Sequence, residues 1–288
     1  TNIMKYLKIQ NNGVLDIRLV ALMGGTTKAN DKYKIGQFGT GLKYTLAFLI
    51  RNNVDFKIFS GEKEIQITTE KEVIQNTEFE IICIEGHRTS ITTSMGTQWS
   101  PWMIISELWC TALDEGGNER EVSYDNDLTG TKDKTTFYIQ MLPDIQTVID
   151  NWDSYFIHSK EPMWENDEYA IYPNKEEGTL KLYKNGVMIY GNPNEKSLFL
   201  YDIKGADINE LREFRGSASM DIFYALTSPN TEVVAYFLNN ITEDHYEGTQ
   251  LDYEWFRSFS SVWKETIGEK RIAKTGDSSY WSERGETI

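Results

Sequence analysis

The sequence is poor in the residues that form disulfide bonds and metal sites. It contains 2 cysteines and 3 histidines in 288 residues. Nothing marks Cys83 and Cys110 as a disulfide pair, so a reducing cytoplasm is the expected environment. His87, His158 and His245 lie far apart and without ligand spacing, which argues against a histidine-based zinc site.

Positive charge and long apolar runs are scarce as well. Lys and Arg total 29 against 44 Asp and Glu, which gives a formal net charge of -15. Neutralising a nucleic-acid backbone needs an excess of Lys and Arg, so we expect no general nucleic-acid surface, although a local basic pocket for a small anion stays open. No apolar run reaches the roughly 18 residues of a membrane span, and we see no signal peptide. We therefore expect no membrane segment.

Apolar and aromatic residues are plentiful. They include 8 Trp, 16 Tyr and 13 Phe, and hydrophobic residues make up 40% of the chain. Such a composition supports a sizeable core, and the length suggests one large or two modest domains. The character of the sequence changes near Pro143. We expect a first domain over 1–142, a second α+β domain over 143–268 and a polar tail over 269–288.

The first domain is predicted to alternate short strands and helices. We expect strands at 5–10, 54–60, 63–70, 78–86, 88–94 and 134–142, of which the middle four form one antiparallel sheet, and helices at 15–23, 41–52 and 100–117. In the last helix, Ser100 is the expected N-cap and Pro101 the first helical residue.

The second half contains a clear hairpin signal. Asn185-Gly186 sits between two alternating segments and predicts a tight turn. We further expect helices at 144–156 and from 207 onward, and a strand at 197–203.

A glycine-rich turn precedes the helix at 41–52. Gly36, Gly39 and Gly41 fall within six residues, and Lys43 follows. Such a turn leaves backbone N–H groups free at a helix N-terminus, where the helix dipole favours phosphate. Because alanine suits a helix better than glycine, we expect Gly41→Ala to fold normally and to lose nucleotide affinity.

Three motifs follow one another in a recognisable order. "IQNNGVLD" is followed by "LVALMGGTTK" and then by "IGQFGTGLK". This order resembles the adenine turn, lid and phosphate turn of the GHKL (Bergerat-fold) ATPases, which include gyrase B and the ninety-kilodalton heat-shock chaperones. The glutamate helix of that family precedes the adenine turn, whereas its counterpart "ELWCTALDEGG" lies downstream here. The chain thus resembles a circularly permuted GHKL domain.

The resemblance implies an α+β fold and a site for ATP. The implied fold is a permuted two-layer α/β sandwich of GHKL type, followed by a smaller α+β transducer-like domain. Glu107 would activate water, and Thr111 would help to hold Mg²⁺. The implied nucleotide-binding residues are Asn11, Gly13, Lys28, Gly36, Phe38, Gly39, Thr40, Gly41, Leu42, Lys43, Thr111 and Asp114. From the second domain, Lys184, Arg212 or Arg215 would reach the terminal phosphate, although each is also explained as a surface charge.

Two positions depart from the family pattern. Asn11 stands where the family has an adenine-binding aspartate, and its amide carries a donor as well as an acceptor, which leaves the choice of base open. Thr111 stands where the family has a magnesium-binding asparagine, and its shorter side chain leaves hydrolysis open. Around Glu107, Thr111 and Asp114 the helix is apolar, so this polar stripe faces either a nucleotide or solvent.

Three hypotheses follow. The first is a purine-nucleotide (ATP) binding protein that acts as a slow Mg²⁺-dependent ATPase. The second is a non-catalytic nucleotide or signalling-molecule binder, a sensor or sponge encoded by a phage or mobile element. The third is a scaffold that binds an unidentified protein partner and uses the glycines only as a turn.

Overall fold

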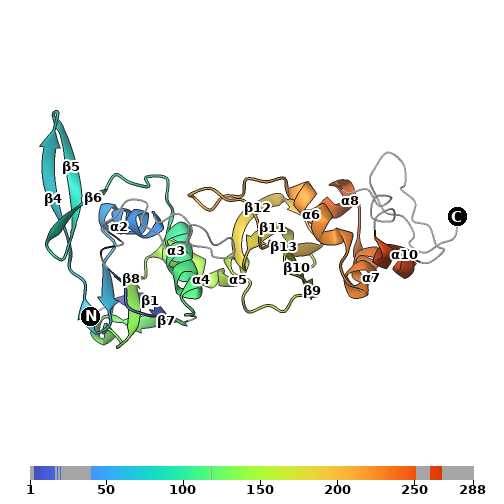
Figure 1. Ribbon diagram of the computed structural model, residues 1–288, viewed down its shortest axis with the longest axis horizontal. Coiled ribbons are helices and arrows are strands. Elements are labelled where there is room, and N and C mark those ends of the chain that lie inside the picture. The colour runs from blue at the N-terminus through green and yellow to red at the C-terminus, as the bar shows by residue number, and fades with distance from the viewer. Residues whose placement is uncertain are drawn as a thin grey trace. The chain divides into compact units, whose positions relative to one another are not determined.

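The computed structural model describes residues 3–16, 18, 20, 40–117, 119–250 and 260–267. The chain divides into two compact units, Thr1–Trp152 and Asp153–Ile288. The described residues form a mixed α and β structure with three sheets (Figure 1). Helix α4 (Pro143–Asp150) packs against helix α3 (Pro101–Asp114), which places it in unit 1, beyond the boundary expected near residue 143.

The main sheet of unit 1 has five strands in the order β3-β2-β8-β1-β7. The strands are β1 (Lys5–Asn12), β2 (Phe56–Ser60), β3 (Lys63–Glu64), β7 (Glu119–Tyr124) and β8 (Lys134–Gln140). Every neighbouring pair is antiparallel. In the interior strand β1, Leu7 lies opposite Ile139 of β8 on one side and Val122 of β7 on the other. A short 3-10 helix, η1 (Asp125–Asp127), follows β7.

A second sheet of unit 1 contains β4 (Ile67–Ile74), β5 (Thr77–Ile84) and β6 (His87–Thr92) in sequential order. The hairpin of β4 and β5 extends away from the five-stranded sheet (Figure 1). The expectation of one sheet from 54 to 94 is therefore wrong, because β2 and β3 pair with β8 and with each other, whereas β4 to β6 pair among themselves.

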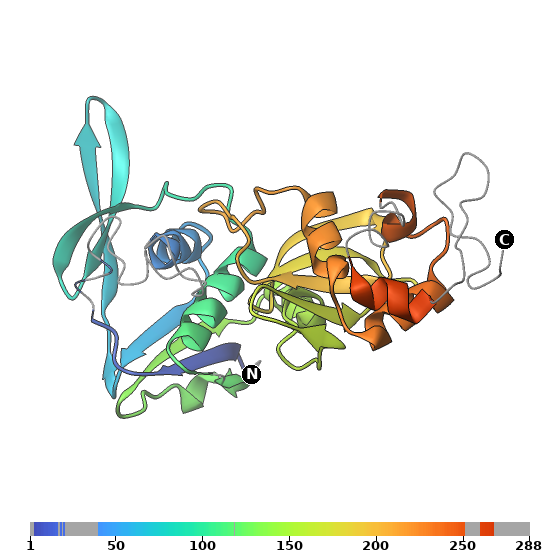
Figure 2. The ribbon, with the colours of Figure 1, turned by 45° about the vertical axis from the view of Figure 1, so that its right-hand side comes forward.

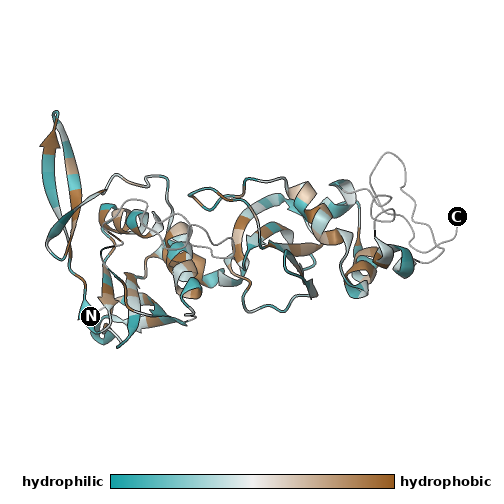
Figure 3. Ribbon diagram, viewed as in Figure 1, coloured by the Kyte–Doolittle hydropathy of each residue, from teal (hydrophilic) through white to brown (hydrophobic). Residues whose placement is uncertain are grey.

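Helices α2 (Gly41–Arg51) and α3 pack against each other, and α3 packs on β1 (Figure 2). Both helices carry apolar residues that are buried, as the brown segments of Figure 3 indicate. Burial of such side chains is the main source of stability for helices of this length. The packing places the first turn of α2 beside the middle of α3.

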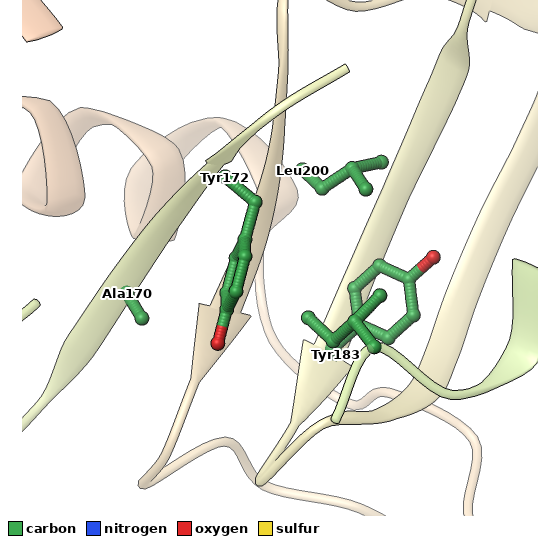
Figure 4. Packing of buried hydrophobic residues seen from close by; sticks show 5 residues of the cluster. Ala170, Tyr172, Tyr183 and Leu200 are labelled. Carbon is green, nitrogen blue, oxygen red and sulfur yellow. The ribbon is translucent and has the colours of Figure 1, made fainter. Parts of the chain in front are cut away.

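Unit 2 is built on a five-stranded sheet with the order β12-β11-β13-β10-β9. Its strands are β9 (Trp164–Glu165), β10 (Tyr169–Pro173), β11 (Thr179–Lys184), β12 (Val187–Lys196) and β13 (Phe199–Ile203). The β11–β12 turn is confirmed at Asn185 and Gly186, whose φ angles of 48° and 80° fit a tight hairpin. Tyr172, Tyr183 and Leu200 pack together in the core (Figure 4).

The remaining helices within the described residues are short. They are α5 (Trp152–Tyr155), α6 (Ala218–Thr227), α7 (Thr231–Asn240), α8 (Tyr246–Gln250) and α10 (Ser261–Ile267). The helix expected from residue 207 is wrong, because the Asn209 side chain accepts hydrogen bonds from the backbone N–H groups of Leu211 and Glu213 and holds a turn instead. None of the described helices is long and apolar enough to cross a membrane.

Candidate functional site

The N-terminus of α2 is the first part of the candidate site. Thr40 occupies the N-cap position, but its side chain does not cap the helix. Thr40 is only 8% exposed, and its buried Oγ1 has no hydrogen-bond partner among the described residues. The first turn of α2 also lacks an acidic residue. A helix N-terminus carries partial positive charge and favours an anion. This end of α2 therefore combines a positive potential with an unsatisfied hydroxyl.

Helix α3 supplies a carboxylate to this position. A Cβ atom added to Gly41 would collide with the carboxyl group of Glu107, so the two residues are in immediate contact. Glu107 is 9% exposed. Gly41→Ala would require the Glu107 carboxyl group to shift, because the glycine makes room for it; normal folding of this variant stays a prediction.

A buried lysine completes the charge arrangement. Lys43 is 2% exposed. Burial lowers the pKa of the Lys43 ammonium, and the attraction of Glu107 partly offsets this effect. Buried charges are stable only when they are paired or hydrogen-bonded. Lys43 and Glu107 are therefore two buried groups of opposite charge that attract each other, and Glu107 lies at the first turn of α2.

The polar face of α3 continues from Glu107. Thr111 Oγ1 lies 3.5 Å from Glu107 Oε1, one helical turn along α3. Asp114 is the last residue of α3 and lies on the same face as Glu107 and Thr111. No group of three His, Cys, Asp or Glu residues within the described ranges is placed to hold a metal ion. A metal here would need oxygen ligands from elsewhere.

The end of β1 forms the second part of the site. Asn11 is 8% exposed, and its Nδ2 donates to the Asn12 carbonyl oxygen at 2.8 Å. Asn12 Nδ2 in turn donates to the Gly116 carbonyl oxygen at 3.3 Å. A Cβ atom on Gly117 would lie 2.6 Å from Asn11 Cα. The residues that follow α3 are therefore packed directly on the end of β1.

Gly13 follows β1 with a φ angle of +85°, a conformation that favours glycine. Its N–H donates to the Asp133 carbonyl oxygen at 2.9 Å, and its carbonyl oxygen accepts from Thr135 Oγ1 at 2.8 Å. Gly13 thus anchors the strand end to β8. Leu42 is the second residue of α2 and is half-buried.

The remaining predicted residues divide into two groups. Lys28, Gly36, Phe38 and Gly39 lie outside the described residues, so the structure does not place them. In unit 2, the buried Lys184 donates to the Ala206 carbonyl oxygen at 2.7 Å. This hydrogen bond gives Lys184 a structural role within unit 2.

Sequence reasoning missed two contributors. Gly117 is the last residue of the helix expected at 100–117, and the absence of a side chain there permits the segment after α3 to approach Asn11 closely. Trp99 packs edge-on against Tyr44 of α2, and its buried Nε1 has no hydrogen-bond partner within the described ranges. Neither contact has a local sequence signal, because each joins segments that are distant in the chain.

Comparison with models of known protein families and with curated proteins finds no match to this chain. The interpretation of the site therefore depends on its residues and their geometry.

Proposed function

We propose that unit 1 binds a purine nucleoside triphosphate, ATP, as a permuted GHKL-type domain. One observation carries the proposal. The N-terminus of α2, which follows the glycine-rich turn, lies directly against Glu107 on the polar face of α3. These motifs are far apart in the sequence, and the resemblance to GHKL proteins assigns both to the same nucleotide site.

The first turn of α2 supplies the phosphate-binding chemistry. Backbone N–H groups at a helix N-terminus attract anions. The Thr40 hydroxyl, which lacks a partner among the described residues, would donate to a phosphate oxygen. The Lys43 ammonium would supply a full positive charge within the protein interior, where electrostatic attraction is stronger than in water.

Mg²⁺ fits this site as a companion of the phosphates. Mg²⁺ commonly takes one or two protein oxygens and completes its shell with phosphate oxygens and water. Thr111 would provide a protein oxygen, since its hydroxyl lies on the polar face of α3, one helical turn from Glu107. The bound ion would neutralise phosphate charge.

Glu107 is the residue that would activate water for hydrolysis. A general base needs a carboxylate within hydrogen-bond reach of the attacking water. Glu107 lies beside the proposed phosphate position. The metal-binding position on the same helix face is Thr111, whose side chain is shorter than the asparagine of the family. We therefore propose slow turnover.

The end of β1 would select adenine. Asn11 Nδ2 donates to the Asn12 carbonyl oxygen, which fixes the orientation of the amide. The Oδ1 atom then remains as the acceptor, and it suits the exocyclic amine of adenine better than the carbonyl oxygen of guanine. Asn11 would thus act as the family aspartate does.

Titration calorimetry of the full chain with ATP, GTP and adenosine tests the proposal. We expect ATP to bind more tightly than GTP, and Glu107→Ala to abolish phosphate release in a malachite-green assay. Asp150→Asn is the matched control, because Asp150 is an exposed acid on α4, away from α2. Failure of all purine nucleotides to bind at millimolar concentration would contradict the proposal.

A non-catalytic binder, sensor or sponge is the second candidate. The observation that favours it is the environment of Glu107, whose carboxylate contacts Gly41 at the N-terminus of α2 and attracts the Lys43 ammonium. Mass spectrometry of the small molecules released from denatured protein distinguishes the two. An intact, unhydrolysed nucleotide supports the binder, whereas ADP after incubation with ATP supports the ATPase.

A further inference from the structure

The Glu107 carboxylate lies at the helix end where a phosphate would bind. It contacts Gly41, the first residue of α2, and it comes from α3 rather than from α2 itself. A carboxylate at this position stabilises a helix through its dipole. Because α2 has no acidic residue in its own first turn, Glu107 supplies the anion for this helix end.

Both the Glu107 carboxylate and a bound phosphate would interact with the Lys43 ammonium. Its ammonium is buried within unit 1 and attracted by Glu107. A phosphate at the N-terminus of α2 would approach the same ammonium. Two like charges at one site repel each other strongly in a partly buried environment. The carboxylate and the phosphate are therefore alternatives.

The Thr40 hydroxyl indicates that the carboxylate does not use every donor at this end of the helix. Thr40 Oγ1 is buried and has no hydrogen-bond partner among the described residues. Leaving a buried hydroxyl unsatisfied is unfavourable by about 1–3 kcal/mol. A phosphate group has several acceptor oxygens where a carboxylate has two, so it would satisfy this donor as well.

We propose that Glu107 and the nucleotide phosphate compete for the N-terminus of α2, so that the carboxylate must leave Gly41 before a triphosphate binds. The inference deepens the proposed function and rests on it. The contact is autoinhibitory: Glu107 supports the fold of unit 1 and opposes triphosphate binding until the phosphate displaces it.

Glu107→Gln separates these two effects. Glutamine keeps the size of the side chain but removes its charge, so the attraction to α2 and Lys43 weakens. We expect a lower melting temperature without nucleotide and an ATP affinity about tenfold higher than that of wild type. Adenosine has no phosphate, so its affinity should not change.

Titration calorimetry with ATP and adenosine, together with thermal unfolding, measures both effects on the full chain. Asp150→Asn, which removes an exposed charge on α4, should leave both ATP affinity and melting temperature unchanged. Glu107→Asp is the second variant if Glu107→Gln does not fold. Its shorter side chain withdraws the carboxylate from Gly41 and keeps a partner for Lys43, and it should also bind ATP more tightly than wild type.

The outcomes separate the two proposals. If wild type binds ATP and neither Glu107→Gln nor Glu107→Asp binds it more tightly, the proposed competition is overturned. The proposed function is then unaffected. Absence of nucleotide binding in wild type and in both variants overturns both. Tighter ATP binding with unchanged adenosine binding supports both.

Discussion

At the scale of single residues, the contact between Gly41 and Glu107 decides how the candidate site works. Helix propensity treats Gly41 as a defect that alanine would repair. The structure gives the glycine a different role, since a side chain at this position meets a buried carboxyl group. The size of the side chain at position 41 and that at position 107 therefore constrain each other.

Gly41→Ala tests this coupling. The new Cβ atom must displace Glu107 from the first turn of α2, and overpacking of this kind costs about 1–3 kcal/mol. We expect a lower melting temperature than wild type in calorimetry. Adding Glu107→Ala removes the colliding group, so the double variant should be less destabilised than the sum of the single variants. A Gly41→Ala variant that melts at or above wild type would show that the contact does not constrain the fold.

At the scale of elements, the sequence predicted individual strands and helices well. The helices at 41–52 and 100–117 and the strands at 5–10 and 134–142 match α2, α3, β1 and β8. Local patterns specify these elements because periodicity and capping are local properties. Sheet membership was not predictable, since β3 and β4 are separated only by Ile65 and Gln66 and yet belong to different sheets.

In the candidate site, too, the local pattern was predictable and the contacts between distant segments were not. Glu107, Thr111 and Asp114 were assigned to one helical face by their spacing, and the structure places them on α3. The collision at Gly41 and the approach of Gly117 to Asn11 depend on how α2, α3 and β1 pack. Such contacts between distant segments have no periodic signature.

Another buried carboxylate lies against the turn of the β11–β12 hairpin in unit 2. Asp202 on β13 accepts a hydrogen bond from the Gly186 N–H at 2.7 Å. Burial raises the pKa of Asp202 to about 6, although hydrogen bonds from the Gly186 and Asn185 backbone oppose this shift. Its ordinary value is 3.8, so the folded protein binds the proton more tightly than the unfolded chain.

Asp202 therefore stabilises unit 2 more at low pH. Its contribution to the free energy of unfolding should be fully present below about pH 4 and lost as the pH rises through about 6, a change of about 3 kcal/mol. Asp202→Asn, which keeps an acceptor for Gly186, should remove this dependence. Calorimetric unfolding at pH 4.5 and pH 7 provides the measurement. The same pH dependence in both proteins would rule out Asp202 as its source.

At the scale of the whole molecule, the predicted site residues that the structure brings together lie in unit 1. The contacts that bring predicted nucleotide-binding residues together involve α2, α3 and β1, which belong to unit 1. In unit 2, Lys184 is buried and bonded to Ala206, and Asp202 holds the hairpin turn. We therefore propose that nucleotide binding belongs to unit 1.

Hydrogen exchange of the full chain, measured by mass spectrometry with and without saturating ATP, tests this assignment most directly. Exchange slows where ligand binding suppresses local opening. We predict slower exchange in peptides from α2 and α3, with unchanged exchange in β10, β11 and β13 of unit 2. Unchanged exchange in α2 and α3 would contradict the account, whether saturating ATP protects only peptides of unit 2 or protects no peptide at all.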